Sequence, residues 1–374
     1  AQGRLEKPTN RHPAASAEAQ ALAADNARRR ILLDDGSALQ NVNPTPYIGV
    51  DNTLRAGDTL PQGITGVIDY GLATNFSDGL SDYRIHPTAP VGFVRSNVRP
   101  AVAPAVGGNV RVGSFNVLNY FSTVDQSGAS CFPGGGRSDC RGADSAAELN
   151  RQRSKIVPAI NALGADVVGL MEIENNGNGA AQDLVNLLNA AAGSGTWATV
   201  ALPPQGTGGD AIRVAMIYRT ARVAPVGLPS SDTDPVHNRP PLAQTFQIAN
   251  GERLSVVVNH FQSKNCDPNS APSDFDQGDG QGCFNPTRVA QSQALLAFIG
   301  QLASIDPDVV VVGDLNAYGK EDPILALQDG GLVDQVDRFN DLAYSYVFDG
   351  ESGYLDHALT TSALSSKVTG AAFW

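Results

Sequence analysis

From residue 110 to the end of the chain, two spacings of apolar residues alternate. Short runs rich in Val, Ile and Leu, typical of β-strands, are separated by longer stretches whose apolar residues recur at helical spacing. Helices are predicted at 145–163, 182–191 and 287–302, and strands at 112–116, 167–175, 196–201, 212–219, 242–248, 254–260, 308–313, 344–348 and 354–360. The uninterrupted Val runs at 256–258 and 309–312 indicate strands that are covered on both faces. The pattern predicts an α/β fold in which packed strands carry helices on the outside.

The predicted helix at 145–163 carries sequence signals at both of its ends. Glu148 lies in its first turn, and Gly164, directly after it, is positioned as a C-cap. Pro158 lies inside the helix and lacks the N–H that a helix interior needs, so we expect a bend or a break there.

Residues 1–95 show a different pattern, in which short β-type segments are separated by turn clusters. The β-type segments lie at 30–33, 63–70, 83–86 and 91–94, and the turn clusters include 34–36 and 75–79. One Ala-rich helix is predicted at 14–29, with its positive charge at the C-terminal end. We expect a small β-barrel or sandwich domain over 1–95 that lacks strands before Ala1. Residues 96–109 form a Pro/Ala/Gly linker, so the second domain spans 110–374.

Composition and charge restrict the class of protein. The chain is 42% apolar and 17% charged, which allows a sizeable core and argues against wholesale disorder. No apolar run approaches the roughly 18 residues of a membrane span, so no membrane insertion is expected. The net charge of -12 argues against a DNA-wrapping role, but a bound divalent cation would still let the protein act on phosphates. The start at Ala1, without Met or a leader, is that of a mature or excised fragment.

The four cysteines form two local pairs, each flanking a loop rich in Gly and Asp. Cys131 is close in sequence to Cys140, and Cys266 to Cys283. Neither spacing is that of a zinc site, and no histidine lies in either loop. Three pairings are open to four cysteines, and the two local loops are favoured among them. Two disulfides indicate an oxidising compartment, and therefore an extracellular or periplasmic location.

Five of the apolar runs lead into a carboxylate, amide or imidazole side chain. These polar residues are Asn116, Glu172, Glu174, His260, Asp314, Asn316 and Asp356. Because unpaired buried polar groups are costly, residues of this kind at strand ends usually face one another across a site. Strand alternation places Asp314 and Asn316 on one face, and likewise Glu172 and Glu174 on one face, opposite Met171 and Ile173.

The residue types favour a hard divalent cation. Glu172, Asn116 and Asp314 supply the sparse set of oxygen ligands that Mg²⁺ prefers. His260 ends its own run, and Asp210 and Asp356 are candidates to orient its imidazole and keep it protonated against a phosphate. Asp356 and His357 are adjacent, so a strand turns them to opposite faces. We expect Asp356 in the site and His357, which alternates with Leu355 and Leu359, in a structural position.

The acidic loop at 274–279 raises the alternative of a structural Ca²⁺. It lacks a full EF-hand pattern and a closing Glu, so a solvated loop tied by Cys266 and Cys283 is favoured instead.

Several short motifs, in this order, resemble the signature blocks of the endonuclease/exonuclease/phosphatase superfamily, which has the DNase I-like fold. They are Ser114-Phe-Asn116, Met171-Glu-Ile-Glu174, Asn259-His260, Gly313-Asp-Leu-Asn316 and Leu355-Asp356. The stretches at 140–144, 151–155 and 279–282 are similar to the bacterial extracellular nuclease branch, which carries an OB-like module upstream. The resemblance implies a four-layer α/β sandwich, with two packed β-sheets flanked by helices, preceded by a small OB-like β-barrel over 1–95.

The resemblance also implies roles for individual residues. Glu172 is the principal ligand of Mg²⁺ or Mn²⁺, and Asn116 beside it contacts metal or phosphate. By the same resemblance, Asp314 binds metal and activates the attacking water, and Asn316 forms a hydrogen bond to the phosphate in the transition state. His260 donates to a phosphate oxygen, and Asp210 orients His260. The two arginines expected to contact phosphate are Arg213 and Arg288. Asp356 partners a second catalytic histidine in a Ser-Asp-His-type block, which the sequence up to Trp374 does not contain.

Together these expectations describe a secreted, divalent-metal-dependent nuclease that hydrolyses phosphodiester bonds of extracellular DNA, with RNA as an alternative substrate. Two other functions stay open. One is a phosphatase or lipid phosphodiesterase of the same fold. The other is a non-catalytic nucleic-acid-binding fragment, which the aromatic residues of the first domain favour and its lack of a dense basic stripe opposes. The sequence leaves the oligomeric state open.

Overall fold

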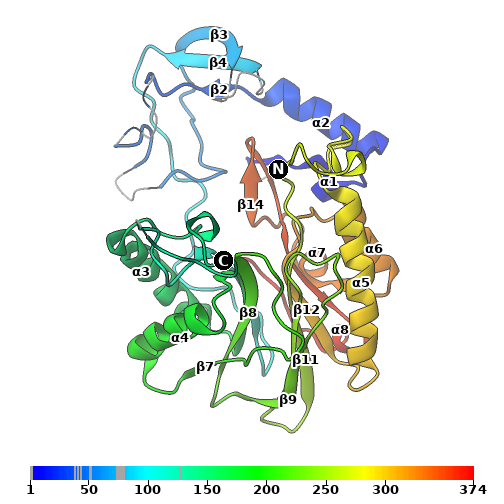
Figure 1. The fold of residues 1–374 in the computed structure, drawn as a ribbon. Coiled ribbons are helices and arrows are strands. Elements are labelled where there is room, and N and C mark those ends of the chain that lie inside the picture. The colour runs from blue at the N-terminus through cyan, green and yellow to red at the C-terminus, as the bar shows by residue number, and fades with distance from the viewer. Residues whose placement is uncertain are drawn as a thin grey trace.

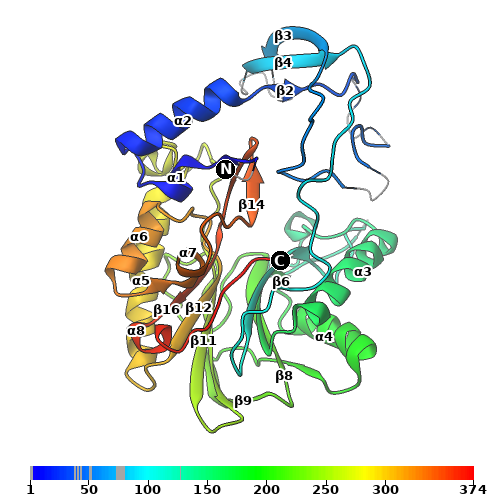
Figure 2. The same ribbon diagram turned by 180° about the vertical axis from the view of Figure 1, so that it is seen from behind.

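Two β-sheets pack face to face at the centre of the protein, with helices on both outer faces (Figures 1 and 2). The computed structural model describes residues 3–37, 39, 42, 44–49, 53–72, 81–126 and 128–374. The larger sheet has the order β13 (Val333–Asp334), β16 (Asp356–Thr360), β12 (Val309–Asp314), β11 (Arg253–His260), β10 (Leu242–Ile248) and β9 (Val223–Ser231). The smaller sheet has the order β5 (Val112–Tyr120), β6 (Val167–Glu174), β8 (Ile212–Arg219) and β7 (Trp197–Thr199).

The helices complete four layers. Helices α3 (Ala146–Leu163) and α4 (Gly179–Ala192) pack on the smaller sheet, and α5 (Asn285–Ala303) and α6 (Asp322–Asp329) pack on the larger one. Two shorter helices, α7 (Gln335–Phe339) and α8 (Ser362–Ser365), lie beside β16, and the short 3-10 turns η1 (Arg137–Asp139) and η2 (Pro272–Asp274) lie in loops. A third apolar core fills the space between the sheets, so the predicted α/β sandwich is confirmed.

A glycine allows the two sheets to approach closely. A Cβ at Gly169 on β6 would lie 2.7 Å from a methyl carbon of Val258 on β11. The bare backbone at this position therefore lets the inner faces of the sheets meet without a void.

Helix α3 begins and ends as its sequence predicts, but it is not broken. The Ser145 hydroxyl accepts a hydrogen bond from the Glu148 N–H, and Gly164 ends the helix with a left-handed φ of 68°. The helix continues through Pro158, which lies on its exposed side. The carbonyl of Ser154, which loses its helical partner there, belongs to an exposed residue and is open to water.

Most other predicted elements of the sandwich agree in place, but strands β9, β13 and β15 and helices α6, α7 and α8 were not predicted. The expected strands at 212–219 and 242–248 match β8 and β10, and the expected helices at 182–191 and 287–302 lie inside α4 and α5. Strand β9 was not predicted because Pro225, Gly227 and Pro229 interrupt its apolar pattern. Proline is tolerated there because β9 is the edge strand of its sheet.

The N-terminal segment, residues 3–30, packs on the second part of the chain. It contains β1 (Leu5–Glu6), α1 (Pro8–Arg11) and α2 (Ala17–Arg29), and β1 pairs with β15 (Glu351–Gly353), which also pairs with β14 (Tyr346–Phe348). The Thr9 hydroxyl donates to Glu321 (2.8 Å), and the buried Asn26 amide donates to Glu351 (2.7 Å). The expected first domain, 1–95, therefore begins with residues that belong by contact to the expected second domain.

The remaining strands of the expected first domain form an open sheet at the top of Figure 1. Their order is β2 (Leu32–Leu33), β4 (Ser81–Pro87) and β3 (Gly66–Leu72). The expected strand at 91–94 is reduced to a single bridge between Thr59 and Val94. The expected turn at 75–79 lies outside the described residues. Within the described part of 31–95 no barrel closes, so the OB-like domain stays a prediction.

None of the described helices combines the length and the apolar character of a membrane span.

Candidate active site

Three of the predicted site residues lie side by side on neighbouring strands of the larger sheet. In the strand register, His260 of β11 is paired with Asp314 of β12, and Asp314 with Asp356 of β16. Paired residues share a face of the sheet, and all three line one cleft of about 1800 Å³ between the sheets. The cleft also contains the predicted Asn116, Glu172 and Asn316.

The adjacent row of the same strands faces the other way, as alternation predicts. His357 is buried there, with Nδ1 3.2 Å from Asp334 Oδ2 and Nε2 2.8 Å from the Ala317 carbonyl. In the same row a Cβ on Gly313, whose φ is 145°, would lie 1.9 Å from the Asn259 carbonyl oxygen, so only glycine fits. His357 is therefore structural, and Asp356 faces the cleft.

A bulge in β6 turns Glu172 into the cleft. Glu172 has a left-handed φ of 64°, and the register with β8 shifts between Leu170 and Ile173. The prediction that Glu172 and Glu174 share a face is wrong because it assumed a regular strand. Met171 packs between the sheets and Ile173 packs against the outer helices, so the two sides of β6 exchange at the bulge.

Glu174 is buried away from the cleft. Its carboxylate accepts hydrogen bonds from the backbone N–H groups of Ser122 and Thr123 and from the Asn176 amide, at 2.9–3.1 Å. These bonds, all to Oε2, fix the loop after β5, and Glu174 does not line the cleft.

Strand β5 presents Asn116 to both carboxylates. Its Nδ2 donates to Glu172 Oε1 (2.9 Å) and lies 3.2 Å from Asp314 Oδ2. The Asn119 N–H donates to Glu172 Oε2 at 2.9 Å. Asn119 and its neighbour Leu118 have left-handed φ angles of 50° and 54°, so the chain doubles back around Glu172.

This turn is held from helix α3. The Gln152 amide donates to the carbonyls of Val117 and Leu118, at 3.1 and 2.8 Å. Gln152 therefore stabilises the turn of β5 that surrounds Glu172.

Asn316 follows β12 and closes the base of the cleft. Its N–H donates to Asp314 Oδ1 (2.9 Å), and its Nδ2 donates to the Phe261 carbonyl (3.0 Å). The left-handed φ of 47° at Asn316 brings its side chain beside Asp314, as the spacing of the two residues predicts.

The acidic groups of the cleft repel one another. Burial, followed by the negative charge of Asp356, raises the pKa of the Asp314 carboxyl. Burial also raises the pKa of Asp356, and the charge of Glu172 adds to that effect. A cation between these carboxylates would relieve the repulsion, so the electrostatics fit a bound metal.

The donor set fits a sparsely held Mg²⁺ or Mn²⁺ rather than a metal enclosed by protein. Among the described residues, no three His, Cys, Asp or Glu side chains are close enough together to hold a metal ion. Glu172 and Asp314 supply hard carboxylate oxygens within hydrogen-bond distance of Asn116 Nδ2, and the Asn116 carbonyl oxygen accepts from the Leu118 N–H at 2.9 Å. Magnesium commonly takes one or two carboxylates and completes its shell with water and phosphate oxygens.

His260 is held differently from the prediction. Arg239 donates to the His260 and Phe261 carbonyls at 3.2 and 2.5 Å, and its Nη1 lies 3.2 Å from Asp210 Oδ2. Asp210 also pairs with Arg141 at 3.0 Å, so its carboxylate orients two guanidinium groups and not the imidazole.

The same contacts decide the charge of His260. Burial, and then the positive charge of Arg239, keep the pKa of His260 well below its ordinary value. The imidazole is therefore neutral at pH 7, not protonated as predicted, and its buried Nδ1 has no hydrogen-bond partner among the described residues. Arg239 gave no signal in the sequence, because it lies in a loop before two prolines.

The two predicted phosphate contacts, Arg213 and Arg288, are wrong. Both are buried, and neither lines the cleft. Arg213 donates to the carbonyls of Gly177 and Val214, and Arg288 to those of Cys283 and Gln281. Each guanidinium satisfies backbone carbonyls, which is a structural role.

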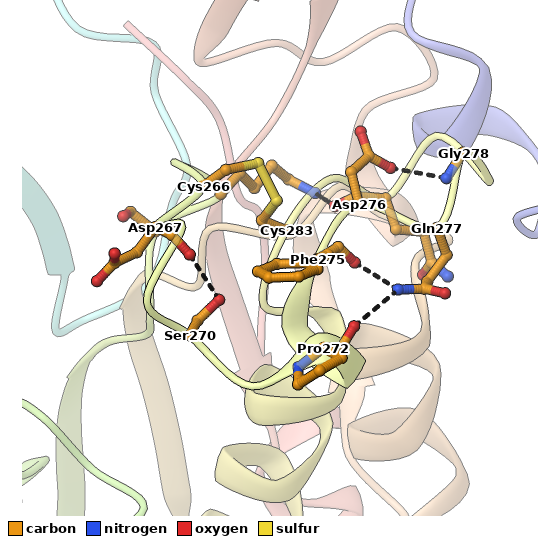
Figure 3. The surroundings of a disulfide bond; sticks show 12 residues. Cys266, Asp267, Ser270, Pro272, Phe275, Asp276, Gln277, Gly278 and Cys283 are labelled. Atoms are coloured by element: carbon orange, nitrogen blue, oxygen red, sulfur yellow. Dashed lines mark hydrogen bonds between the residues drawn. A yellow bond between two sulfur atoms is a disulfide. The ribbon is translucent and has the colours of Figure 1, made fainter.

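The cysteines form the two local disulfides that the spacing favours, Cys131–Cys140 and Cys266–Cys283. Figure 3 shows the second one, with its acidic loop folded onto itself. Asp276 accepts from the Gly278 N–H at 2.8 Å, and Asp274 accepts from the Thr287 hydroxyl at 2.9 Å. These carboxylates have donors of their own, which supports the solvated loop over the Ca²⁺ alternative.

Comparison with known proteins supports the family resemblance. A model of the Endonuclease/Exonuclease/phosphatase family matches residues 113–371. A search of curated proteins finds no match. Similar solved structures include the human Nocturnin catalytic domain with bound sulfate anion, which is 16% identical and matches over 68% of this chain and 82% of that chain with a TM-score of 0.43. A mannosyl-6-phosphatase from Bacteroides thetaiotaomicron is 12% identical and matches over 68% of this chain and 86% of that chain with a TM-score of 0.42. D. rerio TDP2 complexed with single strand DNA product is 14% identical and matches over 68% of this chain and 84% of that chain with a TM-score of 0.40. Because the family model matches well over half of this chain, the chain belongs to the endonuclease/exonuclease/phosphatase family, whose members are phosphoester hydrolases.

Proposed function

We propose that this protein is a secreted, divalent-metal-dependent nuclease that hydrolyses phosphodiester bonds of extracellular DNA, with RNA as an alternative substrate. The observation that carries the proposal is the convergence of Asn116, Glu172, His260, Asp314 and Asp356 at one end of the cleft, from five different strands. The group combines hard oxygen donors, a carboxylate suited to proton transfer and an imidazole, which is what phosphodiester hydrolysis needs.

Each side chain has a task that follows from its contacts. Glu172, held by Asn119, and Asn116 would hold the metal, which when bound supplies a Lewis acid that polarises the phosphate. Asp314 accepts a proton from the attacking water. Its pKa is raised toward neutral pH, and a general base is most effective when its pKa lies near the working pH. Neutral His260 donates a ring N–H to a phosphate oxygen, and Asn316 donates an amide N–H to another.

Secretion is supported by the two disulfides, because disulfides form and persist mainly in oxidising compartments such as the cell exterior and the periplasm. The net charge of -12 makes non-specific attraction to nucleic acid weak, so the bound cation has to supply the local positive charge.

The test is degradation of supercoiled plasmid by the full chain with Mg²⁺ or Mn²⁺ and with a chelator. Cleavage should need the metal, and Glu172→Ala and His260→Ala should each lower the rate about 10² or more. Glu252→Gln is the matched control, because Glu252 is an exposed carboxylate at the opposite end of the same cleft. It should keep the full rate.

Three results would reject the proposal. They are cleavage that persists in chelator, no cleavage of DNA or RNA by the full chain with either metal, and faster hydrolysis of a phosphomonoester than of a phosphodiester. The last result would favour a phosphatase.

A further inference from the structure

Seven Lys and Arg side chains line the cleft in the described part of the chain, and they are Lys7, Arg111, Arg141, Arg239, Arg253, Lys264 and Lys367. Arg111, Arg253 and Lys367 lie at the strand ends remote from the site, because Arg253 begins β11, which His260 ends. Only the other four are placed to meet a substrate at the site.

Three of these four are already occupied. Arg239 is 8% exposed and serves two carbonyls. Lys264 is bonded to Glu321 and the Gln281 carbonyl, and Lys7 pairs with Glu351 at 3.3 Å. The Arg141 side chain is 46% exposed, the most of the four, and the Asp210 carboxylate is its one partner among the described residues, so most of its N–H groups are accessible to a ligand in the cleft.

Arg141 is held in place by the Asp210 carboxylate. Its Nη1 is 3.0 Å from Asp210 Oδ1, and the other oxygen, Oδ2, is 3.2 Å from Arg239 Nη1. Arg239 in turn donates to the His260 carbonyl. One carboxylate and one guanidinium therefore separate Arg141 from the backbone of His260, and this spacing places Arg141 beside the reacting phosphate, not on it.

A disulfide fixes both partners of this ion pair. Cys140 directly precedes Arg141, and its bonded partner Cys131 is fully buried against Ala211 and Ile212, which directly follow Asp210. The loop that carries Arg141 and the strand start that carries Asp210 are thus packed through one small apolar cluster.

We propose that Arg141 binds a non-reacting phosphate of a polynucleotide, next to the phosphate that is cleaved, and that Asp210 is its positioning residue. This rests on the proposed nuclease function and adds that the substrate is a chain of several phosphates. A guanidinium suits this task because it keeps its charge and offers several donors to phosphate oxygens.

The test compares Arg141→Gln with Arg137→Gln in the full chain. Arg137 lies inside the Cys131–Cys140 loop, which Arg141 directly follows; its side chain is 58% exposed and pairs with Asp125, but it does not line the cleft. Arg141→Gln should raise KM for an oligonucleotide about tenfold, as expected for a lost charge-assisted contact. It should also lower the slope of log KM against log salt concentration by about 1. Arg137→Gln should change neither.

A second substrate separates the neighbouring phosphate from the reacting one. Hydrolysis of bis(p-nitrophenyl) phosphate, which has a single phosphodiester, should be the same for Arg141→Gln and wild type. Asp210→Asn should weaken oligonucleotide binding in the same direction as Arg141→Gln, and Arg141→Lys should restore part of the salt slope.

The two proposals fail differently. If the wild type cleaves DNA and Arg141→Gln keeps its KM and salt slope, the Arg141 assignment is wrong and the nuclease function stands. Equal losses on both substrates would place Arg141 at the reacting phosphate and also overturn the assignment. If the wild type neither cleaves nor binds polynucleotides, both proposals fall.

Discussion

At the scale of single residues, the site is built from unfavourable backbone conformations. Leu118, Asn119, Glu172 and Asn316 all have left-handed φ angles between 47° and 64°, although none is glycine. Each such residue costs about 1 kcal/mol or more, and strain of this kind persists only where surrounding contacts fix it. Here those contacts are the Gln152 amide, the hydrogen bond from Asn119 to Glu172 and the hydrogen bond from Asn316 to the Phe261 carbonyl. The strain turns the site carboxylate toward the cleft.

A second residue-scale feature is the buried pair of His357 and Asp334. Burial opposes both charges, but the contact of Nδ1 with Asp334 raises the pKa of His357 and lowers the pKa of Asp334. The histidine contributes stability below its unfolded pKa of about 6.5, and that contribution is lost as pH rises through its folded pKa. The aspartate contributes above its unfolded pKa of about 4, and that contribution is lost as pH falls through its folded pKa.

We therefore predict that His357→Asn lowers the free energy of unfolding by about 3–5 kcal/mol between pH 4 and 6.5, where both groups are charged. The difference from wild type should shrink as pH rises further. Urea unfolding at several pH values measures it. His86→Asn, at a more exposed histidine 3.2 Å from Asp34, is the control and should cost about 0.5 kcal/mol or less. A pH-independent loss at His357 would mean that packing, not charge, explains the residue.

Sequence reasoning succeeded at this scale where alternation applies and failed where burial decides. Asp356 and His357 were correctly separated because they lie on a regular strand. Arg213, Arg288 and Asp210 were misplaced because their partners are backbone carbonyls or arginines remote in sequence. No local pattern shows which carbonyls a fold leaves unpaired.

At the scale of elements, the apolar runs located the strands of the sandwich and the disulfides stabilise its loops. The bulge in β6 and the edge strand β9 were not foreseen, because both depart from regular alternation. The Cys266–Cys283 loop supplies two of the carbonyls that Arg288 binds and one that Lys264 binds, so this loop ties α5 to the strand end of β11.

Removing this disulfide should loosen that connection. We predict that Cys266→Ser with Cys283→Ser lowers the free energy of unfolding by about 3 kcal/mol, as expected for a loop closed over 17 residues. Thermal unfolding followed by circular dichroism, with and without reductant, measures the loss. Reductant should lower the Tm of this variant less than that of the wild type. An unchanged Tm in the variant would show that the hydrogen bonds of Arg288 hold the loop alone.

At the scale of the whole molecule, the open sheet of β2, β3 and β4 projects from one body to which both flanking segments belong. Residues 3–30 pack on the catalytic part before the projection, and Asn97 donates to Tyr344 after it (2.8 Å). Sequence could not reveal this arrangement because α2 reads as a polar surface helix, and only buried Asn26 and Ala19 mark its packed side. The linker composition at 96–109 suggested a boundary between two consecutive domains instead.

Strands β3 and β4 of the projection lie within residues 61–92 and should therefore be removable, while β2 remains. Thr59 and Val94 are paired by two backbone hydrogen bonds (2.8 and 3.0 Å), so their neighbours Leu60 and Phe93 are close enough for an Asn-Gly turn. We predict that replacing 61–92 by Asn-Gly leaves the Tm of the catalytic part within a few degrees and plasmid cleavage within about twofold. A control with the turn inserted between Leu60 and Pro61, without deletion, separates the effect of the turn. A large rise in KM for DNA would show that the projection binds substrate.

The pairing of β1 with β15 also sets an order of events during synthesis. Leu5 pairs with Glu351, so β1 leaves the ribosome long before the strand that pairs with it has been synthesised. At about 5–20 residues per second, that interval lasts roughly tens of seconds. Contacts so distant in sequence are slow to form, so β1 stays unpaired meanwhile. If the chain crosses a membrane unfolded during export, this segment would not oppose the crossing, because β1 would pair with β15 only after the crossing is complete.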